Sequence, residues 1–304
     1  MQDNARSSDR LELFETFVRI VEAGSLSAAA VQLGTTQPTV SRRLRALGDL
    51  LGLRLLQRST HVMKLTEDGE RCLAGARGLL ENWHALDAGL RGAAARPEGT
   101  LRVVAPHAFG QERLLEPVVD FVQRHAGVAV EWLLHDRRPD LIAEGIDCAI
   151  QVGPLDDPSL VAVKLGEVRR VLVAAPAVLA GRPPLAQPDD LAALPWLGLR
   201  PYYRNEVALR DTAGTPVTVP IRPRFSTDSL YALRGAALRG LGCALASKWL
   251  MDKALDDGRL VHLLPAWSAA PLPVHLVYPY SPLLPARLSR FVDAMKAAAP
   301  VALR

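Results

Sequence analysis

A segment near residue 40 carries polar and basic side chains at spacings that suit contact with a nucleic acid. Thr36 is a good N-cap and Pro38 is tolerated in a first helical turn. The apolar residues share one side of the predicted helix: Val40, Leu44, Leu47 and Leu51. The opposite side carries the polar residues: Gln37, Pro38, Ser41, Arg42 and Arg45. The pattern indicates either a helix that enters the DNA major groove or the solvated face of an ordinary three-helix unit.

The residue types on the polar side have the chemistry that contact with DNA requires. An arginine can bind guanine or a phosphate, and a glutamine can pair with adenine. The basic charge of the chain is also concentrated here. The whole chain has a formal net charge of +4, whereas residues 37 to 64 hold six basic residues and one acidic residue, a net charge of +5. Such an excess in one segment favours an anionic partner.

Two shorter helices are expected to hold this segment in place. Apolar residues recur three or four positions apart over residues 10 to 22, which predicts an amphipathic helix. Gly24 ends that helix, and Ser27 can cap a short helix over residues 28 to 33. Gly34 then breaks the chain before the third helix. This order of elements is the one a helix-turn-helix requires.

A long helix is expected after Thr66, which can cap it, and Glu67 and Asp68 suit the positive end of its dipole. Its apolar residues alternate spacings of four and three, as in a heptad repeat: Cys72, Ala76, Leu79, Trp83, Leu86 and Leu90. This stripe could pair with a second chain or pack against its own domain. Residues 92–99 have the glycine, alanine and proline content of a hinge.

From residue 99 onward, apolar runs alternate with helical patterns. Strands are expected at 101–104, 128–134 and 148–152, and helices at 114–125 and 139–144. This alternation is typical of a parallel sheet covered by helices. A second unit begins near residue 169; further elements are expected at 230–238 (helix), 243–246 (strand), 274–278 (strand) and 285–298 (helix). Ligands bind such sheets at the carboxyl ends of the strands.

Several motifs follow one another in the first 70 residues: Phe17-Val18, Ala23-Gly24-Ser25-Leu26-Ser27-Ala28-Ala29-Ala30, Leu33-Gly34, the run from Gln37 to Leu47, Leu51-Gly52, Leu55, Arg58 and Leu65-Thr66-Glu67-Asp68-Gly69. This ordered run closely resembles the DNA-binding domain of LysR-type transcriptional regulators. The resemblance implies a winged helix-turn-helix over residues 1–65. The residues then expected to contact double-stranded DNA are Thr36, Gln37, Pro38, Thr39, Ser41, Arg42, Arg45, Arg58, His61 and Lys64. Gly48, Leu56 and His61 depart from the family's usual glutamate, phenylalanine and arginine.

Further motifs lie in the rest of the chain: Leu101-Arg102-Val103, Pro106 with Phe109-Gly110, Asp140-Leu141-Ile142, Gly145-Ile146-Asp147, Val152-Gly153, Pro176 and Gly240-Leu241-Gly242. They look like the effector domain of the same family. The resemblance implies an α+β multidomain protein whose residues 98–304 form a two-lobed α/β domain like that of periplasmic binding proteins. Lobe one is expected at 98–165 and 271–304, and lobe two at 166–270.

The cleft between these lobes is expected to bind a small organic effector. Its expected lining is Pro106, His107, Ala108, His135, Asp136, Gln151, Thr227, Asp228 and Ser229. Thr227 and Ser229 could instead cap the helix that follows them, and Gln151 could bridge backbone groups. Gln151 stands where close relatives often have arginine, which argues against a strongly anionic effector.

The resemblance also implies partners. Residues 66–97 are expected to pair two subunits through Leu79, Trp83, Leu86 and Leu90, which gives a homodimer or a homotetramer. RNA polymerase is an expected partner if the protein activates transcription. No cofactor and no metal site are expected, because Cys72, Cys148 and Cys243 are widely separated and form no CxxC motif.

Two rival functions are less well supported by the sequence. An enzyme is disfavoured because the sequence contains no nucleophile elbow, HExxH motif or P-loop. A solute-binding protein would need export, yet charged residues interrupt the first 30 positions and exclude an apolar signal core. No apolar stretch of about 18 residues is present, so no membrane partner is expected. The protein is therefore predicted to be a cytoplasmic regulator.

Overall fold

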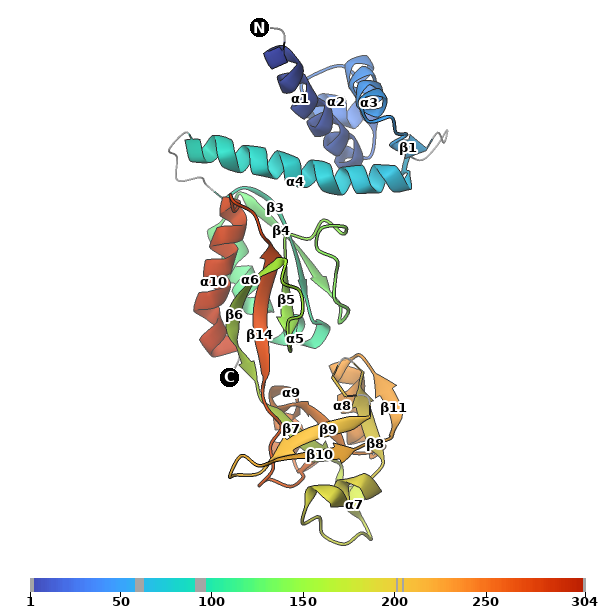
Figure 1. Ribbon diagram of the computed structural model, residues 1–304, viewed down its shortest axis with the longest axis vertical. Coiled ribbons are helices and arrows are strands. Elements are labelled where there is room, and N and C mark those ends of the chain that lie inside the picture. The colour runs from blue at the N-terminus through green and yellow to red at the C-terminus, as the bar shows by residue number, and fades with distance from the viewer. Residues whose placement is uncertain (1–2, 58–62, 91–96, 201, 204, 303–304) are drawn as a thin grey trace.

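The computed structural model describes residues 3–57, 63–90, 97–200, 202–203 and 205–302 of the chain. An N-terminal helical module, a long helix and a two-lobed C-terminal domain follow one another (Figure 1). The expected α+β organisation, with a winged helix-turn-helix, a long helix and a two-lobed α/β domain, is confirmed. No helix within the described ranges is long and apolar enough to span a membrane.

The N-terminal module contains α1 (Asp3–Ala23), α2 (Leu26–Gln32) and α3 (Gln37–Leu51). Phe17 and Ile20 of α1 and Val40 and Leu47 of α3 are fully buried, so these helices share one core. The short strands β1 (Leu56–Gln57) and β2 (Lys64–Leu65) pair in antiparallel fashion and form the base of the wing. This packing fixes which side of α3 remains exposed.

The N-cap of α2 differs from the sequence expectation. Ser25, not Ser27, caps this helix: its backbone is extended and its hydroxyl accepts a hydrogen bond from the Ala28 N–H at 3.1 Å. Gly24 adopts a φ of 71°, which reverses the chain directly after α1. Because the turn is this tight, the second helix begins two residues earlier than expected.

Helix α4 (Glu67–Leu90) begins at Thr66, whose hydroxyl accepts a hydrogen bond from the Gly69 N–H at 2.9 Å. The predicted N-cap is therefore confirmed. Gly69 lies directly against the wing, since a Cβ atom at this position would lie 2.0 Å from the carbonyl oxygen of Leu55. Only glycine permits this approach, which places the start of α4 against the segment that leads into β1.

Lobe one is built on a five-stranded sheet in the order β4-β3-β5-β14-β6. Its strands are β3 (Gly99–Ala105), β4 (Val128–Leu134), β5 (Cys148–Val152), β6 (Leu160–Val168) and β14 (Leu272–Pro279). β3 pairs in parallel with β4 and β5, whereas β14 is antiparallel to β5 and β6. The three strands expected to form a parallel sheet, β3, β4 and β5, do so. The antiparallel part of the sheet comes from β6 and β14, because β14 returns to lobe one after the chain has passed through lobe two.

Helices α5 (His107–Glu112), α6 (Leu115–Arg124) and α10 (Ala286–Ala302) pack on lobe one. The rings of Phe121 and Phe291 lie edge to face at 5.1 Å and join α6 to α10. The helix expected at 139–144 is instead a turn. The Asp140 carboxylate accepts the Ala143 N–H, and the Glu144 carboxylate accepts the Asp140 N–H, both at 3.0 Å. These side-chain bonds, with Gly145 at a φ of 62°, end the turn before a helix can form.

Lobe two contains the antiparallel sheet β12-β7-β13, formed by β7 (Arg170–Ala174), β12 (Ala244–Ser247) and β13 (Val261–His262). Beside it lie the parallel pair β8 (Trp196–Leu199) and β11 (Pro223–Thr227) and the hairpin β9 (Glu206–Arg210) and β10 (Pro216–Pro220). Its helical segments are α7 (Pro176–Leu179), the 3-10 helix η1 (Pro188–Ala193), α8 (Leu230–Leu238) and α9 (Lys248–Asp256). Strand β6 leads from the lobe-one sheet into β7, and β14 leads back.

Candidate DNA-binding surface and interlobe cavity

The polar residues of α3 lie on its exposed side, opposite the buried Val40 and Leu47. Thr36, Gln37, Pro38, Arg42 and Arg45 are exposed, and Thr39 and Ser41 are half-buried. Thr36 is at the N-cap position but its side chain does not cap; its hydroxyl lies 3.0 Å from that of Thr39. The exposed side of α3 therefore presents a continuous polar surface that starts at the first helical turn.

The arginines of α3 differ in what they contact. Arg42 donates to the Thr39 hydroxyl at 3.3 Å and pairs with no carboxylate among the described residues. Arg43 instead forms an ion pair with Glu12 of α1, so it points back into the module. Because its charge is uncompensated by a carboxylate, Arg42 is available to a phosphate or a base.

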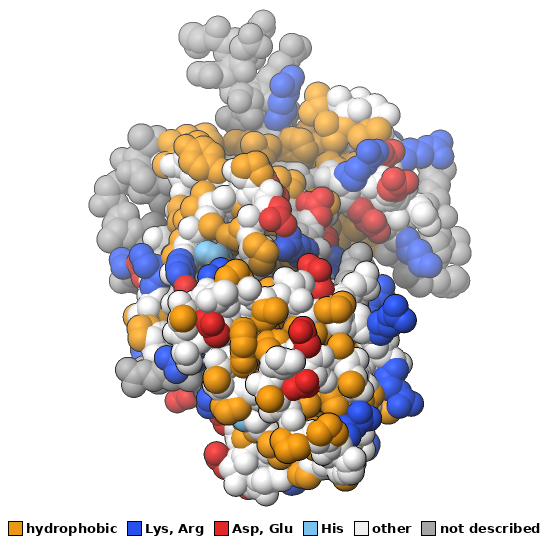
Figure 2. Space-filling view, turned by 60° about the horizontal axis from the view of Figure 1, so that its bottom comes forward, with side chains coloured by type: hydrophobic (Ala, Val, Ile, Leu, Met, Phe, Trp, Pro, Cys, Tyr) orange, Lys and Arg blue, Asp and Glu red, His pale blue; other side chains and the backbone are white. Residues whose placement is uncertain are grey.

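The wing is described only at its base. Lys64 is exposed on β2 and lies opposite Gln57 of β1. Arg58 and His61, which the sequence also placed at the DNA, lie outside the described residues. In Figure 2 the molecule is turned so that lobe two, which lies at the opposite end of the molecule from α3, comes forward. Apolar, acidic and basic side chains are interspersed on the surface of this lobe.

The apolar stripe of α4 divides into two halves. Cys72 and Ala76 pack against α1, and Ala76 shares a buried cluster with Val18. Further along the helix, 45% of Leu79, 48% of Trp83 and 38% of Leu86 are exposed. The side chain of Leu90 lies outside the described part of α4. The first half of the stripe therefore belongs to the core of the N-terminal module, and the described part of the second half is open.

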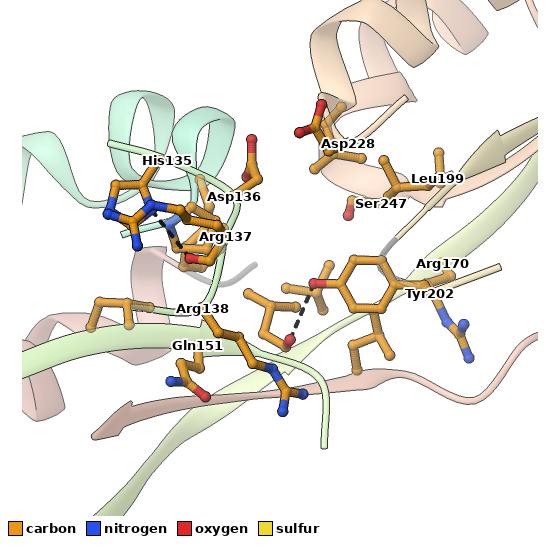
Figure 3. Close-up of a pocket in the computed structure, with 18 of the residues that line it drawn as sticks. His135, Asp136, Arg137, Arg138, Gln151, Arg170, Leu199, Tyr202, Asp228 and Ser247 are labelled. Carbon is orange, nitrogen blue, oxygen red and sulfur yellow. Dashed lines mark hydrogen bonds between the residues drawn. The ribbon is translucent and has the colours of Figure 1, made fainter. Parts of the chain in front are cut away.

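A cavity of about 150 Å³ lies between the two lobes. Five residues expected from the sequence line it: Pro106, His135, Asp136, Gln151 and Asp228 (Figure 3). Pro106, Asp136 and Gln151 lie at or just after the ends of β3, β4 and β5, as parallel strands predict. This volume is equivalent to roughly five water molecules at about 30 Å³ each, and protein cavities of about 150 Å³ bind benzene, so a small organic molecule fits.

Four other expected residues do not line the cavity. His107 is exposed and Ala108 is buried at the start of α5. Ser229 caps α8, where its hydroxyl accepts the Ala232 N–H at 3.3 Å, and the Thr227 hydroxyl accepts the Ser229 N–H at 3.1 Å. Thr227 and Ser229 thus make the capping and turn contacts that the sequence left open as an alternative.

Several lining residues were not expected from the sequence. They include Arg137 and Arg138 between β4 and the turn, Arg170 of β7, Tyr202 and Tyr203 after β8, and Trp249 of α9. Tyr202 follows the carboxyl end of β8, which pairs in parallel with β11, so the strand-end rule could have identified it. Arg170 and Trp249 lie near the antiparallel sheet of lobe two, to which that rule does not apply.

Side chains from the two lobes make direct contacts around the cavity. The Tyr202 hydroxyl donates to the Val152 carbonyl at 3.1 Å, and the Tyr231 hydroxyl donates to the Glu112 carboxylate at 2.8 Å. The Arg113 guanidinium lies 5.0 Å from the ring centroid of Trp249. Burial raises the pKa of Tyr202 to about 12, so its hydroxyl remains a hydrogen-bond donor even at alkaline pH.

Asp136, which lines the cavity, and Glu144, at its edge, have shifted pKa values. Burial raises the pKa of Asp136, an effect that the hydrogen bond from the His107 N–H partly offsets, while nearby Asp228 raises it. The hydrogen bond from Arg137 lowers the pKa of Glu144 to about 2. No group of three or more metal-ligating side chains occurs in the part of the chain that the structure describes. The cavity has apolar walls with a few charged and hydroxyl groups, a lining that suits a small organic ligand.

Comparison with known proteins agrees with this arrangement. Residues 11–70 match the bacterial regulatory helix-turn-helix protein family of the lysR type, and residues 94–300 match the LysR substrate binding domain. The transcriptional regulator PtxR of Pseudomonas aeruginosa is 32% identical over 284 residues, which cover 92% of this chain and 90% of PtxR. The transcriptional activator AaeR of Escherichia coli is 30% identical, with 94% and 93% coverage.

Solved structures give the same result. The full-length virulence activator AphB of Vibrio cholerae has a TM-score of 0.59 at 28% identity and covers 94% of this chain and 98% of its own. CrgA of Neisseria meningitidis has a TM-score of 0.58 at 30% identity, with 95% and 98% coverage. The chain belongs to the LysR family of transcriptional regulators, with a helix-turn-helix DNA-binding domain followed by an effector-binding domain.

Proposed function

We propose that this regulator binds operator DNA through the N-terminal half of α3 and responds to a small organic effector in the interlobe cavity. The cavity is the observation that carries the proposal, because side chains from both lobes enclose it. A molecule that contacts both lobes binds one lobe arrangement better than another. It can shift the protein only by that difference in affinity, so a tenfold preference corresponds to about 1.4 kcal/mol.

On this proposal the DNA contacts come from the exposed residues of α3, together with Lys64, Arg58 and His61 of the wing. Arg42 and Arg45 supply charge, and Gln37 at the helix N-terminus supplies a group that can pair with a base. The protein has no catalytic role and acts on DNA in the cytoplasm, and it contacts RNA polymerase at promoters that it activates.

The exposed half of the α4 stripe supports association of two chains. Leu79, Trp83 and Leu86 project apolar surface from one helix, and Leu90 continues their spacing. Large apolar patches on one face of a helix are stable in water when a partner covers them. We therefore infer a homodimer joined through α4, with pairing of dimers into a homotetramer as the next level of assembly.

The proposal is tested by a DNA-binding assay followed by a ligand screen. An electrophoretic shift with the DNA that flanks its own gene should show specific binding. A metabolite screen by thermal shift should then find an effector whose affinity changes when operator DNA is added, because coupling between two sites is reciprocal. A hit that binds with the same affinity in the presence and absence of operator DNA would show that the two sites are not coupled.

Variants at Leu199 locate the effector. Leu199 lines the cavity, and Figure 3 shows its side chain there. Leu199→Trp should fill part of the space and abolish the thermal shift, whereas Leu199→Met conserves volume and should retain it. Ser229→Ala, which removes a capping group that does not line the cavity, should also retain it. A hit that binds the Leu199→Trp protein unchanged would place the effector elsewhere.

A further inference from the structure

The charged groups that line the cavity differ in whether they already have a partner. Arg137 pairs with the Glu144 carboxylate, and Arg138 pairs with Asp156 at 3.1 Å and donates to the Pro154 carbonyl at 2.9 Å. Neither carboxylate lines the cavity. These two arginines thus each already have a carboxylate partner at its edge.

The third arginine is held away from the centre of the cavity. Arg170 donates from Nε to the Ala270 carbonyl at 2.7 Å, and it also donates to the Tyr203 hydroxyl. Figure 3 shows its guanidinium group directed away from Asp136 and Asp228. An anion between the two aspartates would therefore meet no arginine that is directed toward it.

The two aspartates that line the cavity have no positively charged partner among the described residues. Asp136 follows β4 of lobe one and accepts one hydrogen bond, from the His107 N–H at 3.1 Å. Asp228 precedes α8 of lobe two and has neither a hydrogen bond nor an ion pair with any described residue. The two carboxylates approach each other from opposite lobes (Figure 3). Asp228 is exposed and Asp136 is half-buried. Two like charges that face each other across a cleft repel, and a cation placed between them relieves that repulsion.

The rest of the cavity indicates that a molecule with an apolar body belongs there. Phe109, Ile150 and Leu199 contribute apolar walls. Trp249 also lines the cavity, and its indole nitrogen is buried without a hydrogen-bond partner among the described residues. Its indole ring adds to these apolar walls, which suit the apolar body of a ligand.

We propose that the effector is a small organic cation, an amine on an apolar body, whose charged group lies between Asp136 and Asp228 and joins the two lobes. This inference rests on the proposed function, because it assigns a chemical class to the effector of the same cavity. Gln151, which offers no positive charge at the lining, is compatible with a cation. Each lobe supplies one of the two carboxylates, so the cation favours their approach.

The test compares probes that differ only in charge. Benzylamine, benzyl alcohol and benzoate share a ring and are nearly equal in size. Each is titrated into the full-length 15N-labelled protein, and the indole N–H signal of Trp249, assigned by its loss in Trp249→Phe, reports binding at the cavity. Benzylamine should bind at least tenfold more tightly than benzyl alcohol, and benzoate should bind most weakly.

Charge-neutral variants test which residues create the preference. Asp228→Asn should reduce the ratio between amine and alcohol to threefold or less. Asp136→Asn should act alike, since its amide oxygen can still accept the His107 N–H. Asp189→Asn makes the same charge change at an exposed position of lobe two that does not line the cavity, and it should leave the ratio unchanged.

The outcomes separate this inference from the proposed function. Two results would show that the effector is not a cation, although the cavity would remain a ligand site. In the first, the Trp249 signal shifts but the amine and the alcohol bind equally well; in the second, it shifts but benzoate binds more tightly. A tenfold preference that persists in both the Asp136→Asn and Asp228→Asn proteins would also overturn it. If no probe moves the Trp249 signal, both the cation and the effector cavity are wrong.

Discussion

The DNA-binding surface and the interlobe cavity are built in opposite ways. The residues proposed to contact DNA from α3 lie within ten positions, 36 to 45, on one side of a single helix. The lining of the cavity comes from eight regions of the chain, between residues 104 and 272, that belong to two lobes. A helix face moves as one rigid unit, whereas a cavity between lobes changes shape whenever they move. The first arrangement suits a fixed contact with DNA, and the second suits a signal.

The largest effect that is confined to one region should come from a core substitution in the N-terminal module. Phe17 is fully buried, and its cluster is distinct from the clusters of the two lobes. Phe17→Ala should cost about 3 to 5 kcal/mol and unfold this module while the lobes remain folded. Calorimetry should then show loss of one transition, and gel shift should show loss of DNA binding. Simultaneous loss of all transitions would mean that the regions fold as one unit.

A charge on the exposed stripe of α4 should have the next largest effect. Leu86→Asp places an unpaired carboxylate in the proposed interface, which should weaken association by about 3 kcal/mol, more than 100-fold. Sedimentation velocity at low micromolar concentration measures this. Ile142→Asp is the matched control, since Ile142 is also an exposed aliphatic residue (72%) but lies on lobe one. An unchanged oligomer in Leu86→Asp would place the interface elsewhere.

Removal of one basic side chain from α3 should have a moderate effect on DNA affinity alone. Arg42→Ala should weaken specific binding by about 1 to 3 kcal/mol without unfolding the protein. Arg43→Ala is the neighbouring control, because Arg43 pairs with Glu12 and its loss should change affinity by about 0.5 kcal/mol or less. Fluorescence anisotropy with operator DNA compares them; equal losses would indicate only general charge attraction.

The smallest effect is expected where the lobes meet. Tyr231→Phe removes the hydrogen bond to Glu112 and should lower the free energy of unfolding of the C-terminal domain by about 0.5 to 1.5 kcal/mol. Tyr280→Phe removes a hydroxyl from a residue that is 73% exposed and should have no effect. Urea denaturation measures both. If Tyr231→Phe leaves the free energy of unfolding unchanged, this contact does not stabilise the closed arrangement of the lobes.

The same contact predicts a pH dependence. Burial and the hydrogen bond to Glu112 raise the pKa of Tyr231 to about 12. A raised pKa means that the folded state favours the protonated phenol, so its contribution is complete below pH 10 and is lost as the pH rises toward 12. The stability difference between the Tyr231→Phe and parent proteins should therefore shrink over this range. A difference that is constant from pH 9 to 12 would contradict the proton linkage.

The contrast between the two regions also explains how far the sequence could predict them. The exposed side of α3 follows from the helical period alone, so its orientation needed no tertiary information. Pro106, Asp136 and Gln151 were predictable because parallel strands end on one edge of a sheet. Arg170 and Trp249 were not, since their position depends on how lobe two packs on lobe one. The heptad pattern of α4 likewise did not reveal that Cys72 and Ala76 pack on α1.

The close contact at Gly69 gives α4 the geometry of a lever. Its pivot is the segment that leads into the wing, because the start of the helix lies against the backbone of Leu55. The 24 residues of α4 extend about 36 Å from that point. A swing of about 10° would therefore move the far end by roughly 6 Å for this helix length. In reverse, a few ångströms of displacement at the effector-domain end would turn the wing by an angle large enough to change how it meets the DNA backbone.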